Sequence, residues 1–415
     1  MGYDSAQSVR HGGRDRVEAT PPRRMRFALG YWRRAAGAAI ICALILGAWL
    51  SLRFARADWF FREKTPDGVA RAVALSPRDT EYLSLRALQI DYDGGDPAPL
   101  LLRAAELNPL AAAPRMRLGL DAEIHGDIRA AEKWLLDAAR VSRQFEPRWT
   151  LSNFYFRQSR ADDFWTWIRQ ALAVSYGDRT PAFDLCWRFS QNPKAILDRA
   201  IPDRHDVLAA YLIYLIDQHH LDAAAPVSMR LVSGHIPADR ELLLGAGDAL
   251  LDARMTGAER ELWQALGLPV ADGITNPDFA PLALGHGFDW RPITSPGVRH
   301  TLLSTPSALR IDLSGAQPEA CELVRQMMTV KPGARYAFHW KSRTQDLPAP
   351  SGLRWQIAGQ SFPIEPSEDW RDDSGMFLAR DALDSVVLIY QRVEGQPRAE
   401  GRIELRDIRI TEARQ

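Results

Sequence analysis

Residues 331–344, KPGARYAFHWKSRT, place three aromatic side chains, Tyr336, Phe338 and Trp340, on alternate positions. In an extended chain alternate positions share one face, so these rings could form a platform on which sugars stack. The same pattern is also what the buried face of a strand in a β-sandwich requires. The stretch GLRWQIAG, 352–359, repeats the alternation and favours the second interpretation, in which the rings form the core.

A ligand of these strands would then meet their opposite, polar face. The candidates for a glycan-binding face are side chains with charged or hydrogen-bonding ends, namely His339, Lys341, Arg354, Gln356 and Arg392. The alternative is an ordinary solvated sheet face, and the residue types do not separate the two.

Catalytic spacing is absent from the sequence. It contains no G-x-S-x-G, H-E-x-x-H or G-x-G-x-x-G motif and no P-loop. The adjacent acids Asp162-Asp163 and Asp372-Asp373 are more typical of helix caps and solvated turns than of a glycosidase pair. We therefore expect a non-enzymatic protein with no catalytic residues.

Metal sites are not expected either. His219 and His220 are neighbours, so their side chains diverge around a helix instead of chelating as an i, i+4 pair would. The acidic stretch DYDGGD, 91–96, lacks the ligand order of an EF-hand and fits an inter-helix turn. We predict no metal and no cofactor.

One segment predicts a membrane helix. Ala35 to Leu52 runs without a charge and has Trp32 and Trp49 near its ends, where amphipathic rings favour the interface. Arginines precede and follow it, with a small excess before it. We expect a cytoplasmic, partly disordered leader over 1–34, an anchor over 35–52 and periplasmic domains after it. The alternative is secretion after cleavage near Ala57, at the sequence ARA.

The stretch from 58 to 265 is helical and repetitive. ARAVALSP, 70–77, and LRAAELNP, 102–109, share an Ala at one spacing before a Pro, and 116–139 has Leu118-Gly119 before a turn at Gly126. This pattern resembles the tetratricopeptide repeat (TPR), an α-solenoid of helix pairs. The resemblance implies a groove that binds a protein partner, lined by Met116, Leu120, Glu123, Trp149, Asn153 and Phe156. The alternative is that these side chains pack against the following helices.

Composition changes after 265. A Pro- and Gly-containing linker is expected at 266–275, followed over 276–415 by short alternating runs typical of an antiparallel β-sandwich. The order of the Asn-x-x-Phe opening, the turn VKPGARY and the closing strand RIELRDIRI resembles the galactose-binding-like jelly roll of many carbohydrate-binding modules. The predicted fold class is thus α + β and multidomain.

The 47 arginines against 5 lysines are typical of a GC-rich bacterial genome. With the features above, they predict a bacterial inner-membrane protein with a single span. The chain is 46% apolar and 25% charged with a formal net charge of zero, which does not favour a nucleic-acid partner. The expected role is a TPR scaffold or adaptor of the envelope, with a sandwich that contacts glycan or protein. The alternatives are an accessory carbohydrate-binding component of exopolysaccharide assembly or export and, less favoured, a polysaccharide-acting enzyme.

Overall fold

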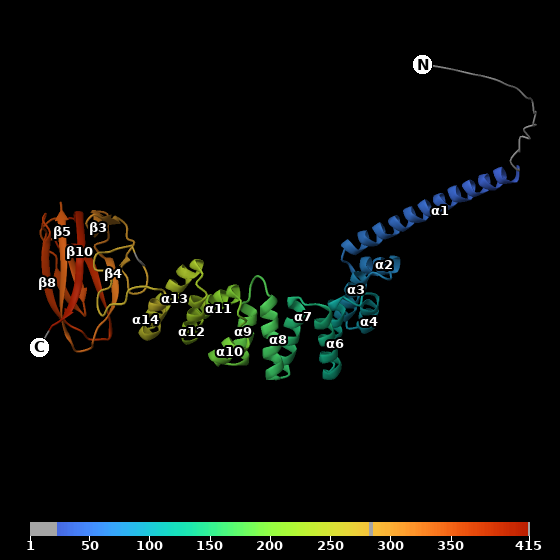
Figure 1. Cartoon of the computed structure of the whole chain (residues 1–415), viewed down its shortest axis with the longest axis horizontal. Helices are drawn as coiled ribbons and strands as arrows, with labels where there is room; N and C mark the ends of the chain where they lie inside the picture. The colour runs from blue at the N-terminus through green and yellow to red at the C-terminus, as the bar shows by residue number, and fades with distance from the viewer. Residues whose placement is uncertain (1–22, 282–284, 414–415) are drawn as a thin grey trace, which may run out of the picture. The chain divides into compact units, whose positions relative to one another are not determined.

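The computed structural model describes residues 23–281 and 285–413, with side chains from residue 31 onward. Most of the predicted leader, residues 1–22, lies outside the described part of the chain. The chain divides into two compact units, one ending at Arg143 and one beginning at Gln144. The first unit contains helices, and the second contains further helices followed by strands (Figure 1).

The first element is a long helix, α1 (Arg23–Arg62), of 40 residues. Its part from Tyr31 to Arg62 contains a window with a mean hydropathy of 2.2, none of which is buried, so it is long and apolar enough to cross a membrane. The helix does not stop at the end of the predicted anchor. It continues without a break past Leu52 and packs against the next helix through its last turns.

The remaining helices of the first unit follow one another as hairpins. They are α2 (Pro66–Leu75), α3 (Thr80–Tyr92), α4 (Ala98–Leu107), α5 (Ala112–Ile124) and α6 (Ile128–Val141). In the pair α5–α6, a Cβ added to Gly119 would lie 2.7 Å from the side chain of Leu135. Gly126 turns the chain with a φ of +82°. The small residue at the crossing and the glycine turn are as the repeat pattern predicts.

The second unit begins with further helices. They are α7 (Phe145–Arg157), α8 (Ala161–Val174), α9 (Thr180–Phe189), α10 (Pro193–Arg199), α11 (His205–Asp217), α12 (Leu221–Ser233), α13 (Arg240–Asp252) and α14 (Thr256–Ala265), with a 3-10 turn over Pro237–Asp239. The pairs α7–α8, α11–α12 and α13–α14 pack against each other. Helix pairs therefore continue beyond the region where the repeat pattern is clear.

Two antiparallel sheets follow, in the strand orders β1-β4-β9-β6-β7 and β2-β3-β10-β5-β8. The strands are β1 (Arg291–Pro292), β2 (Val298–Ser304), β3 (Ser307–Ser314), β4 (Ala320–Thr329), β5 (Arg335–Gln345), β6 (Leu353–Ile357), β7 (Gln360–Pro363), β8 (Arg371–Leu378), β9 (Leu383–Gln391) and β10 (Glu400–Glu412). Without β1 and β2, the orders β3-β10-β5-β8 and β4-β9-β6-β7 are those of a jelly roll. The predicted fold class, helix pairs followed by an antiparallel sandwich, is confirmed.

The aromatic row of β5 belongs to the core of this sandwich. Tyr336, Phe338 and Trp340 are all buried, and Phe338 meets Trp355 of the other sheet edge-on at 5.6 Å. The two inner faces thus meet through their aromatic rings. The polar residues that alternate with the rings must face outward.

The stretch predicted as a linker is partly packed, although Gly267, Pro269, Ala271 and Asp272 are exposed. Leu268, Ile274 and Thr275 are buried. The Gln326 side chain on β4 accepts a hydrogen bond from the Thr275 backbone N–H at 3.0 Å and donates one to its carbonyl at 2.6 Å. Leu268 also joins a cluster with α13, α14 and Leu383 of β9, so the last helix hairpin and the sandwich share a hydrophobic contact.

Candidate functional site

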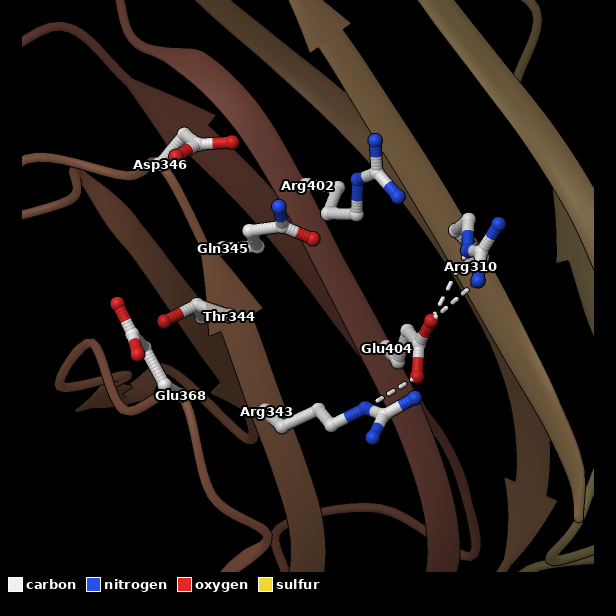
Figure 2. Close-up of a pocket in the computed structure, with 8 residues that line it drawn as sticks. All are labelled: Arg310, Arg343, Thr344, Gln345, Asp346, Glu368, Arg402 and Glu404. Carbon is white, nitrogen blue, oxygen red and sulfur yellow. Dashed lines mark hydrogen bonds and ion pairs between the residues drawn. The ribbon is translucent and has the colours of Figure 1, made fainter.

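The outer face of the sheet β2-β3-β10-β5-β8 carries a polar hollow of about 350 Å³ (Figure 2). It lies over three neighbouring strands. Its walls are Arg310, Arg343, Thr344, Gln345, Asp346, Glu368, Arg402 and Glu404. Charged side chains of both signs line it, and the three arginines come from β3, β5 and β10.

Strand register creates the central feature of this hollow. Glu404 on β10 lies opposite Arg310 on β3 and opposite Arg343 on β5, so one row across the sheet reads Arg–Glu–Arg. Arg310 donates two hydrogen bonds to Glu404 Oε1 at 2.8 and 2.9 Å, and Arg343 Nε donates to Oε2 at 2.5 Å. Figure 2 shows the carboxylate held between the two guanidinium groups.

Glu404 is almost completely covered although it points away from the core. Its side chain is 4% exposed, against 30% for Arg310 and 40% for Arg343. Burial by itself would raise the pKa of Glu404, but the hydrogen bonds from Arg343 and Arg310 outweigh it, and the net shift of the pKa is downward. Glu404 is therefore an ionised group that fixes two guanidinium groups whose remaining N–H donors stay accessible.

An aromatic ring adjoins this row. Trp370, just before β8, is half-buried, and the guanidinium carbons of Arg343 and Arg406 lie 5.1 and 4.2 Å from its ring centroid. The preceding loop is attached to the end of β5, because the backbone of Ser367 bonds to Thr344 at both its N–H and its carbonyl. A fixed row of planar donors beside an aromatic ring can bind a ligand with many hydroxyl or carboxylate oxygens.

Known structures resemble parts of this chain. No protein-family model and no curated protein sequence matches it. Among solved structures, a carbohydrate-binding module, CBM4, is 11% identical with a TM-score of 0.26, covering 34% of this chain and 99% of its own. The CBM1 module of BiXyn10A is 15% identical with a TM-score of 0.25, covering 33% and 94%. YrrB, a TPR protein with an unusual peptide-binding site, is 11% identical with a TM-score of 0.25, covering 49% and 92%.

These similarities concern the fold. The fold assignment rests on the helix pairs and on the jelly-roll strand order. The chain therefore has a part built of helix pairs, followed by a jelly-roll sandwich.

The five residues predicted to form a glycan face lie on two opposite surfaces of the sandwich. His339 and Lys341 are on β5, on the same outer face as the hollow. Arg354 and Gln356 are on β6 and Arg392 follows β9, so these three belong to the other sheet. Arg354 and Arg392 line a separate hollow of about 330 Å³ there. The structure therefore does not bring the five together.

The six residues predicted for a partner groove are divided between the two units. In the first unit, Met116, Leu120 and Glu123 lie on α5. Leu120 is 37% exposed and lines a small hollow with Leu88 of α3 and Ile124 of α5. Met116 and Glu123 are half-buried and do not line it.

The other three groove residues lie on α7 in the second unit. Trp149 is half-buried and stacks on Phe145 at 5.9 Å. Asn153 donates its amide hydrogen to the Trp149 carbonyl at 2.9 Å, within its own helix. Phe156 packs on Phe189 at 5.9 Å. Phe156 thus packs against a later helix, whereas these contacts of Trp149 and Asn153 lie within α7.

The adjacent acids and His220 contact neighbouring side chains. Asp162 and Asp163 form ion pairs with Arg199 and Arg160 at 2.6 and 2.7 Å. Among the residues described, no group of three or more His, Cys, Asp or Glu side chains could hold a metal ion.

On β8 the other acid pair is split by the alternation of the strand. Asp372 lies near Lys341 at 3.7 Å and Asp373 near Arg371 at 2.8 Å, and the two acids point to opposite sides of the sheet. His220 stacks on Trp187 at 3.9 Å.

The sequence indicates the outward position of some residues of the hollow. Alternation in ALRIDLSG and RIELRDIRI puts Arg310, Arg402 and Glu404 on the polar face of their strands. Nothing local shows that these strands are neighbours, because β3 and β10 are far apart in the chain. Trp370 lies in the loop sequence SEDW, which carries no periodicity that could have indicated its position beside the arginines.

Proposed function

We propose that this protein is a membrane-anchored, non-enzymatic scaffold of the bacterial envelope, in which the helix pairs bind a protein partner and the sandwich binds a glycan. The observation that carries the glycan part is the row Arg310–Glu404–Arg343 beside Trp370. Sugars present hydroxyl and carboxylate oxygens to planar donors and C–H faces to rings, and both kinds of group are held ready on this face.

The state of Glu404 supports a binding role over a catalytic one. A glycosidase needs a general acid that keeps its proton near neutral pH, which requires a raised pKa. The pKa of Glu404 is shifted in the opposite direction, because two arginines stabilise its charge. This carboxylate therefore serves to position its neighbours.

Retention of the anchor is supported by the burial of Ala57. This residue lies within α1 and is completely buried, packed with Ala72 and Tyr82. Cleavage near Ala57 would remove most of a helix whose last turns are part of the folded domain, including the hydrogen bond from Arg53 to the Leu75 carbonyl. We therefore favour a single-pass inner-membrane protein with periplasmic domains over secretion after cleavage.

The glycan proposal is tested with purified full-length protein in detergent on an array of neutral and uronate-bearing polysaccharides. Arg406→Ala and Trp370→Ala should each weaken binding about tenfold or more, the effect of roughly 1.4 kcal/mol. Arg354→Ala is the matched control, because it removes a half-buried arginine from the opposite face.

Other outcomes would contradict this assignment. Loss of binding in Arg354→Ala alone would move the site to the other sheet. If the wild-type protein retained no polysaccharide, the glycan function would be rejected and the sandwich would be a protein-contact module. Polysaccharide cleavage products would instead support the enzymatic alternative.

The partner proposal is tested in cells by a photo-crosslinking amino acid at Leu120, in the hollow between α3 and α5. A discrete cross-linked partner is expected there. The same amino acid at Lys133, exposed on α6 of the same hairpin, should give none. Equal products at both positions would argue against a groove on α5.

A further inference from the structure

The end of α1 and the first helix hairpin are joined by specific contacts. Arg53 Nε donates a hydrogen bond to the Leu75 carbonyl at 2.6 Å. Ala57 packs in one cluster with Ala72, and a Cβ added to Gly68 would lie 2.7 Å from the Phe60 carbonyl. Residues of increasing number in α1 thus meet residues of decreasing number in α2. Helix α2 runs antiparallel to α1, and its C-terminal end points back toward the apolar segment.

This arrangement places the turn between α2 and α3 level with the end of the apolar segment. Arg53 directly follows Leu52, the last residue of the uncharged stretch. Because that stretch rises about 1.5 Å per residue, it spans close to the thickness of the hydrocarbon core, and Arg53 lies at its surface. Residues 76–79 follow Leu75, whose carbonyl Arg53 binds, so they lie at the same depth.

We infer that the α2–α3 turn, residues 76–79, together with Arg53 and Arg56 of α1, forms a contact surface for anionic lipid headgroups. The inference rests on the membrane anchor of the proposed function. The headgroup layer is about 5–8 Å thick on each side, which corresponds to roughly four or five residues of helix beyond Leu52.

The distribution of charge fits an anionic surface. Arg56 and Arg78 are exposed and Arg53 is half-buried, and all three lie at the level of the turn. Basic side chains near an anionic bilayer surface are attracted to it. Asp79 caps α3 by accepting from the backbone N–H groups of Glu81 and Tyr82, so its carboxylate is held at the helix end.

The acidic end of the same hairpin points the other way. Arg86 Nη1 of α3 lies 3.5 Å from the Pro66 carbonyl at the start of α2, which shows that α3 runs back along α2, away from the membrane. With 13 residues, α3 is about 20 Å long. The exposed acids Asp91, Asp93 and Asp96 at its far end therefore lie well outside the headgroup layer.

Aromatic side chains at the same level also suit the interface. Trp49 and Phe54 of α1 are 54% and 53% exposed. Tryptophan is enriched where the bilayer meets water, because its ring is apolar and its N–H is polar. The helix thus carries rings and arginines over the few turns that cross this layer.

The test uses the full-length protein in vesicles of phosphatidylcholine and phosphatidylglycerol that contain a small fraction of nitroxide-headgroup lipid. Cys42 and Cys321 are replaced by Ser, and the buried Cys186 is kept. A bimane label is attached at Pro77→Cys or, as the matched control on the same hairpin, at Asp93→Cys. Both positions are exposed.

Quenching at position 77 should be several-fold stronger than at position 93, and it should weaken in vesicles of phosphatidylcholine alone. Equal quenching at the two positions, in protein that resists alkaline carbonate extraction, would overturn the inference and leave the anchor intact. Quenching that does not depend on phosphatidylglycerol would overturn the assignment to anionic lipid. Release by carbonate would overturn the anchor and this inference together.

Discussion

Raising the pH from about 5 to about 8.5 should weaken the packing of the hairpin α13–α14 against the sandwich, because a buried acid there must ionise. Glu259 of α14 is 1% exposed, and its Oε2 has no hydrogen-bond partner among the described residues. Its carboxyl group lies against Gly247 of α13, where a Cβ would come within 2.3 Å of it. A Cβ on Gly287 would lie 2.9 Å from the same carboxyl group.

The elements packed against Glu259 carry further charged side chains. Asp248 of α13 accepts hydrogen bonds from the Gly287 backbone and from Arg291 of β1, both at 2.7 Å. His286 lies 2.7 Å from Asp248, and its other ring nitrogen lies 3.2 Å from Glu241. Arg291 is thus already paired with Asp248, and it only partly offsets the negative field at Glu259.

Burial, with the Asp248 carboxylate adding to it, raises the pKa of Glu259 to about 8 from its ordinary 4.5, and Arg291 opposes this shift. Between those two values the folded protein holds a proton that the unfolded chain has released. The free energy of unfolding therefore falls as pH rises through this window. At about 1.4 kcal/mol for each tenfold change in proton affinity, the upper limit of the loss is about 5 kcal/mol.

Glu259→Gln removes the titration and keeps the shape. Calorimetric melting of the full-length protein in detergent should give similar transitions for the variant and the wild type at about pH 5, where both side chains are neutral. Toward about pH 8.5 the wild-type melting temperature should fall well below that of the variant. Glu241→Gln is the matched control, since this acid faces the same histidine but its side chain is 82% exposed.

Comparing the variant with the wild type separates the effect of Glu259 from that of every other group that gains or loses a proton over the same pH range. Parallel curves of melting temperature against pH for the two proteins would refute the reasoning. So would a Glu259→Gln protein that is already strongly destabilised at the acidic end.

Two further predictions concern packing. Gly119→Leu should overpack the α5–α6 crossing against Leu135 and cost about 1–3 kcal/mol, measured as a lower melting temperature, whereas Gly245→Leu, which has open space at its Cβ, should cost less. Equal losses of stability in the two variants would show that Gly119 does not lie at the helix crossing. Trp340→Ala should remove a buried ring and destabilise the sandwich by about 3–5 kcal/mol, and His339→Ala, on the outer face, should stay within about 0.5 kcal/mol. A stable Trp340→Ala protein would contradict the core position of the ring.

Much of the fold follows from local patterns. Alternation assigned Tyr336, Phe338 and Trp340 to one buried face, because a strand has only two faces and a sandwich core takes the apolar one. The Leu-Gly pair and the small residues of the repeat indicated the crossing of α5 and α6, because helices that approach closely need a missing side chain. The uncharged stretch 35–52 indicated a helix long enough to span a membrane by itself.

Only the tertiary structure decided which polar residues act together. His339 and Arg354 have equivalent positions in their own strands, but β5 and β6 belong to different sheets, so their polar faces point in opposite directions. The row Arg310–Glu404–Arg343 joins strands separated by most of the sandwich sequence, and Trp370 joins it from a loop. Periodicity reports the face on which a side chain lies. Pairing between distant strands depends on how the whole chain folds, and no local pattern contains it.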